Sequence, residues 1–255
     1  MRRLLLHAGG GPRRWHGLVL IAALLIAWQV LFEVAGEDAM APPIATLLYL
    51  LHLLETADFW SNMMATGAAF LLAVGIALVL GLAIGFALGL HRFSREVAEP
   101  ILVSFYAIPK VTLYPIVLLA FGIGMSSKVA FGAMHGVVPM AILTMTAIRT
   151  LNPVLLKTAR IMRLSPWTVA RSIILPSALP EIFTGIRVSF ALTLIGTLLG
   201  EMFGSQRGLG YLLMTAIGLQ NVRMIMAVTL LLVLFAASVS IALIAVDRRL
   251  HRIAR

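Results

Sequence analysis

The ionisable residues inside the apolar segments are the first candidates for chemistry. Lys110 follows Pro109 in one apolar segment, and His135 lies in the next. A charge inside a membrane is costly, so such residues count as functional candidates. If Lys110 faces a water-filled path, it favours an anionic cargo; the alternative is a side chain that snorkels to the membrane interface. His135 has a simpler interpretation as a hydrogen-bonded packing residue.

Hydroxyl side chains in the apolar segments can extend a polar path. Alternatively, serine and threonine hydroxyls bond back to carbonyl groups of their own helix. The predicted substrate path consists of Lys110, Thr112, His135, Ser189, Thr193, Thr197 and Glu201.

Motifs for covalent chemistry are missing. The sequence has no G-x-x-x-x-G-K-[ST] phosphate loop, no H-E-x-x-H and no G-x-S-x-G. The three aspartates, Asp38, Asp58 and Asp247, lie in loops or at the edge of a span, and the absence of cysteine excludes thiolate metal sites. We therefore predict a non-catalytic protein with no metal or cofactor of its own. If this protein pumps, the energy comes from a partner.

Composition identifies the elements that must position these residues. Of 255 residues, 61% are hydrophobic and 12% are charged, and the mean hydropathy is +1.02. A soluble domain has about 25% charged residues. We predict an all-α polytopic membrane protein, residues 1–255 forming a single domain. Its six transmembrane helices are expected at residues 15–35, 62–90, 100–122, 128–149, 182–203 and 224–246, with a short surface helix at 44–54.

Basic residues alternate between the two sides of these spans. Sixteen fall on the side of both termini, and three (Lys128, Arg207 and Arg223) fall on the other. By the positive-inside rule, both termini lie in the cytoplasm. The net charge of +10 then reflects loops beside lipid rather than nucleic-acid binding.

Small residues and prolines indicate how the spans pack. Gly81, Gly85 and Gly89 share one helix face, which predicts close helix packing within the chain or, less favoured, a dimer seam. Pro109 and Pro115 interrupt the third span, and Pro139 interrupts the fourth. Broken helices need neighbours to satisfy their backbone groups, so these two spans are expected in the interior.

A basic insert at residues 149–188 is unlike the rest of the chain. Pro153 and Pro166 predict the starts of two short helices, 153–162 and 165–175, and Pro176 predicts the end of the second. Exposed Leu, Trp and Arg at helical spacing are typical of an interface. The alternative is a helix pair lying on lipid headgroups, but the prolines favour a fixed shape that fits a protein socket.

Residues 157–180, KTARIMRLSPWTVARSIILPSALP, resemble the EAA coupling loop of binding-protein-dependent ABC importer permeases. The segment FYAIPKVTLYPIVLLAFGIGMSSK resembles the third-helix signature of the branch that imports nitrate, sulfonates and taurine, and GEMFGSQRGLGYLL resembles the family motif after the fifth helix. Two positions depart from the pattern: Lys157 replaces the usual acid, and Arg163 replaces the usual glycine. The turn between the short helices can therefore differ, and the partner groove is expected to be more acidic than usual.

The resemblance implies the type I ABC importer permease fold, with a cytoplasmic coupling loop at about 150–181, in the bacterial inner membrane. It implies a dimer of ATP-binding subunits that holds ATP and Mg, a second permease copy, and a periplasmic or lipid-anchored binding protein. The coupling residues it implies are Leu155, Lys157, Ala159, Arg160, Arg163, Ser165, Trp167, Arg171 and Pro176.

The cargo implied by the resemblance is a small anion such as a sulfonate, taurine or nitrate. Relatives that take up thiamine-precursor pyrimidines or aromatic carboxylates supply an alternative. A secondary transporter, the alternative from another class, predicts an intramembrane carboxylate row or inverted halves, and the sequence shows neither.

Overall fold

Regular structure in the described part of the chain is helical. The computed structural model describes residues 13–253, with side chains described for residues 15–247. No strand occurs between residues 13 and 253. The basic residues expected at the chain ends lie outside the described side chains: Arg2, Arg3, Arg13, Arg14, Arg248, Arg249, Arg252 and Arg255.

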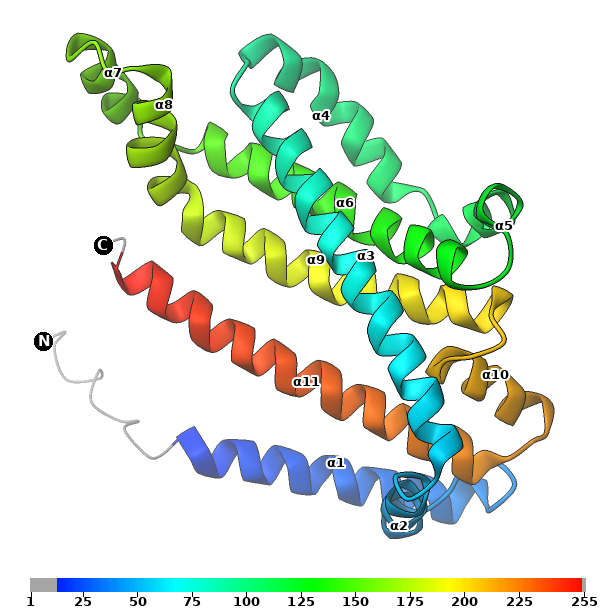
Figure 1. Ribbon diagram of the computed structural model, residues 1–255. Coiled ribbons are helices and arrows are strands. Elements are labelled where there is room, and N and C mark those ends of the chain that lie inside the picture. The colour runs from blue at the N-terminus through cyan, green and yellow to red at the C-terminus, as the bar shows by residue number, and fades with distance from the viewer. Residues whose placement is uncertain (1–12, 254–255) are drawn as a thin grey trace, which may run out of the picture.

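Five helices are long and apolar enough to cross a membrane, and counting a bent pair of helices as one broken span brings the number to six (Figure 1). The five are α1 (Arg13–Ala35), α3 (Ala57–Gly89), α6 (Met125–Arg149), α9 (Leu175–Gly204) and α11 (Val222–Ile253). The bent pair comprises α4 (Arg92–Ala107), a 3₁₀ turn (Lys110–Leu113) and α5 (Tyr114–Phe121), with an angle of 86°. The predicted number of crossings agrees with this arrangement.

The third crossing begins earlier than the predicted residue 100. A loop was expected at Arg92 and Arg95, but both residues lie in α4, and Pro100 lies inside that helix. An ion pair between Arg92 and Glu96, 2.7 Å apart and one turn along α4, stabilises the helix start. The predicted break occurs where Ile108 adopts an extended ψ of 131° directly before Pro109.

The expected helix end at Pro176 is also wrong. Short helix α8 (Pro166–Val169), a π-helical turn (Ala170–Ile174) and α9 form one continuous helix. The N–H of Leu175 bonds to the carbonyl of Ala170, five residues back. This wider turn accommodates Pro176, which lacks an N–H group, within the first turn of α9.

Helices α3, α6 and α9 form the tightly packed centre of the bundle. Of the two spans expected in the interior, the fourth (α6) lies there but continues through Pro139 without the predicted break, whereas no residue of α4 in the third is buried. Gly81 of α3 faces Met140 of α6, and Gly85 faces Thr144. The glycine row is therefore an intramolecular seam, as expected from the favoured alternative.

Substituting alanine for Gly85 is expected to destabilise the bundle by about 1–3 kcal/mol, the usual cost of overpacking. The added Cβ would lie 2.5 Å from Thr144 Cβ and 2.8 Å from the Ala141 carbonyl oxygen. Gly75 is a matched control on the same helix, since no atom lies within 4 Å of its Cβ position. Detergent-resistance unfolding of G85A and G75A should separate the two; equal stability would contradict the seam.

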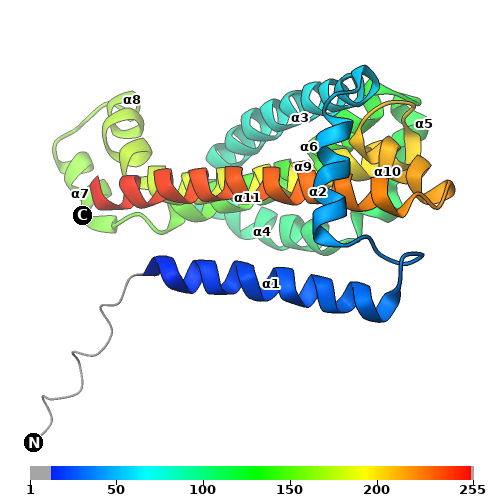
Figure 2. The same cartoon turned by 90° about the horizontal axis from the view of Figure 1, so that it is seen from below.

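Two short helices close one end of the bundle. The predicted surface helix is present as α2 (Pro43–Leu53), whereas α10 (Leu209–Gly218) was not predicted. Leu50 and Leu53 of α2 pack with Leu209 and Leu212 of α10 in one apolar cluster, which extends to α11. Figures 1 and 2 show α2 running across the direction of α1 and α11 rather than along it.

The two ends of the bundle carry different elements. The first residues of α1, the last residues of α11, α7 (Pro153–Ile161) and α8 lie at one end in both views (Figures 1 and 2). Helices α2, α5 and α10 lie at the other end. The basic insert therefore lies at the same end of the molecule as the start of α1 and the end of α11.

Candidate functional site

Two capped helices build the basic insert. The Asn152 side-chain oxygen accepts a hydrogen bond from the N–H of Val154 at 2.9 Å, and α7 follows. Ser165 Oγ accepts from the N–H of Thr168 at 3.2 Å at the start of α8. These caps fix the starts of both helices at the predicted prolines. The first helix, α7, keeps its predicted bounds closely, whereas the second continues into α9 instead of ending at Pro176.

Arg163, which replaces the family glycine, lies in the turn between α7 and α8. Arg163 has φ of +48°, in the left-handed region that glycine favours. The N–H of Arg163 bonds to the Arg160 carbonyl, and the N–H of Leu164 bonds to the Ala159 carbonyl. This is a Schellman motif. The turn keeps the conformation that a glycine would take, with an arginine in its place.

The surface formed by α7 and α8 exposes large apolar side chains to water. Ile161 is 83% exposed and Trp167 is 73% exposed. Lys157 and Arg160 of α7 are also exposed, and so is Arg171 in the π-helical turn that follows α8. We call these five residues, with Leu155, the α7–α8 surface. A patch of exposed apolar residues with a basic rim is typical of a binding interface.

The predicted coupling residues are all exposed except one. Ala159 is buried, at 2% exposure, and so serves the packing of α7 rather than direct contact. Ile161 was missed by the sequence reasoning, although it directly follows Arg160 in an amphipathic helix. The exposed members are Leu155, Lys157, Arg160, Arg163, Ser165, Trp167, Arg171 and Pro176.

Three of the predicted path residues lie between helices. Ser189, Thr193 and Thr197 of α9 are at most 1% exposed. Ser189 Oγ donates to the Gly136 carbonyl at 2.9 Å, and Thr197 Oγ1 donates to the Thr193 carbonyl at 2.9 Å. Ser189 therefore bonds α9 to α6, whereas Thr197 bonds back within α9, and the hydroxyls of Thr193 and Thr197 pack against Gly136 and Gly132 of α6 rather than line an open space.

His135 also has a packing environment. Its Nδ1 lies 2.8 Å from the Phe131 carbonyl oxygen, and its ring meets the Phe131 ring edge-on. A Cβ on Gly196 of α9 would lie 2.7 Å from the imidazole. The simpler interpretation of His135, as a hydrogen-bonded packing residue, agrees with this geometry.

Lys110 and Thr112 lie apart from the buried residues, at the bend between α4 and α5. The Lys110 ammonium donates to the Tyr106 carbonyl at 3.1 Å and lies 4.9 Å from the centre of the Tyr106 ring. No carboxylate within the described part of the chain forms an ion pair with Lys110. Thr112 is exposed, and its hydroxyl donates to the Pro109 carbonyl at 2.8 Å. The bend therefore carries a half-buried lysine that has no carboxylate partner among the described residues.

Glu201 belongs to a buried ion pair at the opposite end from the basic insert. Its Oε1 accepts from the Lys128 ammonium at 3.1 Å, and its Oε2 accepts from Thr66 Oγ1 at 2.8 Å. The side chains of Lys128 and Glu201 are 4% and 0% exposed. The pair joins α3, α6 and α9, so this predicted path residue has a structural environment.

The same network holds the start of α10. The backbone N–H groups of Gly208, Leu209 and Gly210 donate to Asn62, Thr66 and Glu201, respectively. Gly208 has φ of +127°, and a Cβ there would overlap the Glu201 carboxylate. Glycine at position 208 is therefore required by conformation and by space. Lys128, Asn62 and Thr66 were missed, because only the three-dimensional fold brings them together.

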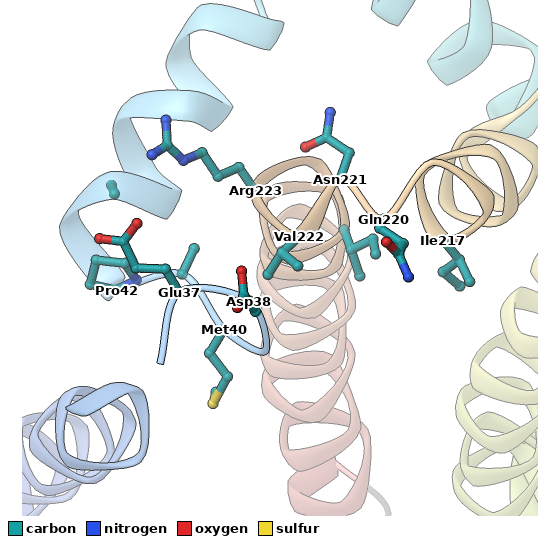
Figure 3. Close-up of a pocket in the computed structure, with 12 residues that line it drawn as sticks. Glu37, Asp38, Met40, Pro42, Ile217, Gln220, Asn221, Val222 and Arg223 are labelled. Atoms are coloured by element: carbon teal, nitrogen blue, oxygen red, sulfur yellow. The ribbon is translucent and has the colours of Figure 1, made fainter. Parts of the chain in front are cut away.

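An open cleft of about 730 Å³ lies between the segment before α2 and the junction of α10 with α11 (Figure 3). Glu37 and Asp38 line one wall, and Asn221 and Arg223 line the other. The carboxylate of Glu37 and the guanidinium of Arg223 extend toward the same space (Figure 3). This polar cleft lies at the end of the bundle remote from the α7–α8 surface.

The family described as "Binding-protein-dependent transport system inner membrane component" matches residues 77–254 of this sequence. The chain belongs to that family. The riboflavin transport system permease protein RibX of Chloroflexus aurantiacus is 36% identical over 79% of this chain and 76% of its own length. The putative aliphatic sulfonates transport permease protein SsuC of Bacillus subtilis is 27% identical over 78% of this chain and 73% of its own length. The predicted family and branch are thereby confirmed.

Solved structures bear on the fold of this permease. A chain of the MetNI methionine ABC transporter, solved in inward-facing conformations, aligns with a TM-score of 0.65 and 21% identity. The alignment covers 83% of this chain and 99% of the MetNI chain. It confirms the type I importer permease fold. The protein is therefore a multi-pass permease subunit of an ABC importer, a membrane component without catalysis of its own.

Proposed function

We propose that the α7–α8 surface binds an ATP-binding subunit, and that this contact transmits the energy of ATP hydrolysis to the permease. The observation that carries this proposal is the exposure of Ile161, at the end of α7, and of Trp167, at the start of α8, on a capped helix pair that also exposes basic residues. ATP and Mg are held by the partner. Closure of two such partners moves the α7–α8 pairs of two permeases and opens the transport path alternately to each side.

The assembly we propose contains two copies of this chain with the α7–α8 surface in the cytoplasm. The positive-inside rule supports this orientation, since Arg92, Arg149 and the basic α7–α8 surface share one side. A binding protein delivers cargo to the opposite face, where the polar cleft of Glu37, Asp38 and Arg223 offers charges of both signs for contact.

The cargo we propose is a small anion such as a sulfonate, taurine or nitrate. Lys110 is the single charged residue between Glu99 and Lys128, and it has no carboxylate partner within the described chain. A cation left without a counter-charge at a bend in a membrane helix suits a path for anions. The SsuC relative supports the same class.

A second candidate cargo is a neutral aromatic heterocycle such as riboflavin. The observation that favours it is the RibX relative, at 36% identity. For such a cargo the charge of Lys110 would have no counterpart on the transported molecule.

Replacing Lys110 with methionine separates the two cargo classes. For an anion, loss of a charge-assisted contact is expected to lower uptake about tenfold or more. Lys110→Arg keeps the charge and is the matched control. The measurement is uptake of labelled ethanesulfonate and of riboflavin by proteoliposomes with the complete transporter and its binding protein. Ethanesulfonate uptake unchanged in Lys110→Met would contradict the anion proposal, and riboflavin uptake unaffected by the variant would favour the second candidate.

A further inference from the structure

Helix α4 is held to the bundle by few contacts. None of its residues is buried, in contrast to α3, α6 and α9. Its principal neighbours are α6 and α3, and Figure 1 shows it on the side of the bundle opposite to α1 and α11. A helix without buried side chains can shift relative to its neighbours at low cost. The polar contacts between α4 and other helices therefore decide with which of them α4 moves.

One ion pair within the described chain joins α4 to another helix. Arg149 Nη1 donates to both carboxylate oxygens of Glu99, at 3.0 Å and 3.2 Å. The side chains are 55% and 37% exposed. Of the other charges on this part of α4, Arg92 pairs with Glu96 on the same helix, and Arg95 donates at 3.4 Å to the Gly89 carbonyl at the end of α3, the helix that directly precedes α4.

Arg149 stands at the junction between α6 and the α7–α8 surface. It is the last residue of α6, and α7 begins at Pro153. Thr150 Oγ1 bonds back to the carbonyls of Thr146 and Ala147, which fixes the end of α6. Only residues 150–152 separate Arg149 from α7, so a displacement of α7 reaches the Arg149 side chain through a short, ordered connection.

We propose that the Glu99–Arg149 ion pair makes α4 follow the α7–α8 surface when an ATP-binding subunit moves it. This inference rests on the proposed function of that surface. Eleven residues beyond Glu99, the chain reaches Lys110 at the 86° bend. As a helix, α4 transmits the displacement along its axis to this bend, so the pair links energy input to the cation at the path.

An exposed ion pair contributes little to folding stability. Its loss is therefore expected to appear in coupling rather than in the amount of folded protein. This distinguishes the Glu99–Arg149 pair from the buried Lys128–Glu201 pair, which is a structural element.

The test is a charge-swap cycle in the complete transporter: Glu99→Arg, Arg149→Glu and the double variant. We expect each single variant to lower the cargo imported per ATP hydrolysed roughly fivefold or more, the lower range of allosteric coupling. The amount of bound ATP-binding subunit should stay unchanged. The double variant should restore the ratio. The matched control is the same cycle on Arg92 and Glu96, a pair within α4 that should have no effect on the ratio.

Single variants with the wild-type ratio would overturn the inference, and so would a double variant that fails to restore it. If a charge reversal prevents membrane insertion, Glu99→Gln and Arg149→Gln supply the same comparison. Failure of the proposed function gives a different result: the wild-type permease itself would then neither bind the ATP-binding subunit nor couple hydrolysis to import.

Discussion

Replacing Glu201 with glutamine is expected to lower the free energy of unfolding by about 3–5 kcal/mol, the cost of leaving a buried charge without its partner. Three donors converge on the Glu201 carboxylate: Lys128, Thr66 and the N–H of Gly210. A glutamine side chain has one acceptor oxygen and an NH₂ group that only donates. The NH₂ group would face one of the three donors, which would then lose its acceptor. The measurement is unfolding by SDS titration in mixed micelles.

The control for this variant is Glu96→Gln, which breaks the exposed pair with Arg92. That pair is exposed, so its loss is expected to change the stability far less than Glu201→Gln does. A second comparison replaces both buried partners with apolar residues, Lys128→Met with Glu201→Leu, which should recover part of the loss. A Glu201→Gln protein as stable as Glu96→Gln would contradict the structural role of the buried network.

Replacing Trp167 with alanine is expected to weaken binding of the ATP-binding subunit about 30-fold, which corresponds to ~2 kcal/mol for an interface hot spot. Trp167 is exposed in the first turn of α8, so its removal leaves the fold of this permease intact. Reversing the charges of Arg160 and Arg171 should weaken binding further, because an acidic groove is expected on the partner.

The matched control is Trp15→Ala. Trp15 is 66% exposed at the same end of the molecule but belongs to α1. Titration of detergent-solubilised permease with the purified ATP-binding subunit measures both affinities. Equal losses of affinity in the two variants would indicate a general effect of exposed aromatic residues rather than a binding site for the ATP-binding subunit at Trp167.

The sequence predicted the membrane helices, helix α7 and the start of α8, because hydropathy, charge alternation and helix caps are local signals. It also predicted the broken third crossing, since Pro109 forces the preceding residue out of the helical region. The start of that crossing at Arg92 was missed because charged residues beside an apolar run resemble a loop. Pro176 was misjudged because a π-helical turn, which no local pattern indicated, removes its conflict with the helix.

The buried network was beyond the reach of such reasoning. Lys128 and Glu201 are 73 residues apart in sequence, and only the packing of α6 against α9 brings them together. The same packing places Ser189, Thr193 and Thr197 between helices, where a hydroxyl pattern alone suggested a path. Position 163 is that of a glycine in the family pattern, and Arg163 adopts the positive φ that glycine favours.

The most direct test of energy input at the α7–α8 surface is cargo uptake by proteoliposomes that contain the permease with or without its ATP-binding subunit. We predict uptake that requires ATP and the ATP-binding subunit, and that falls in Trp167→Ala but not in Trp15→Ala. Uptake that proceeds without the ATP-binding subunit and follows an imposed ion gradient would contradict the account, because it would identify a secondary transporter.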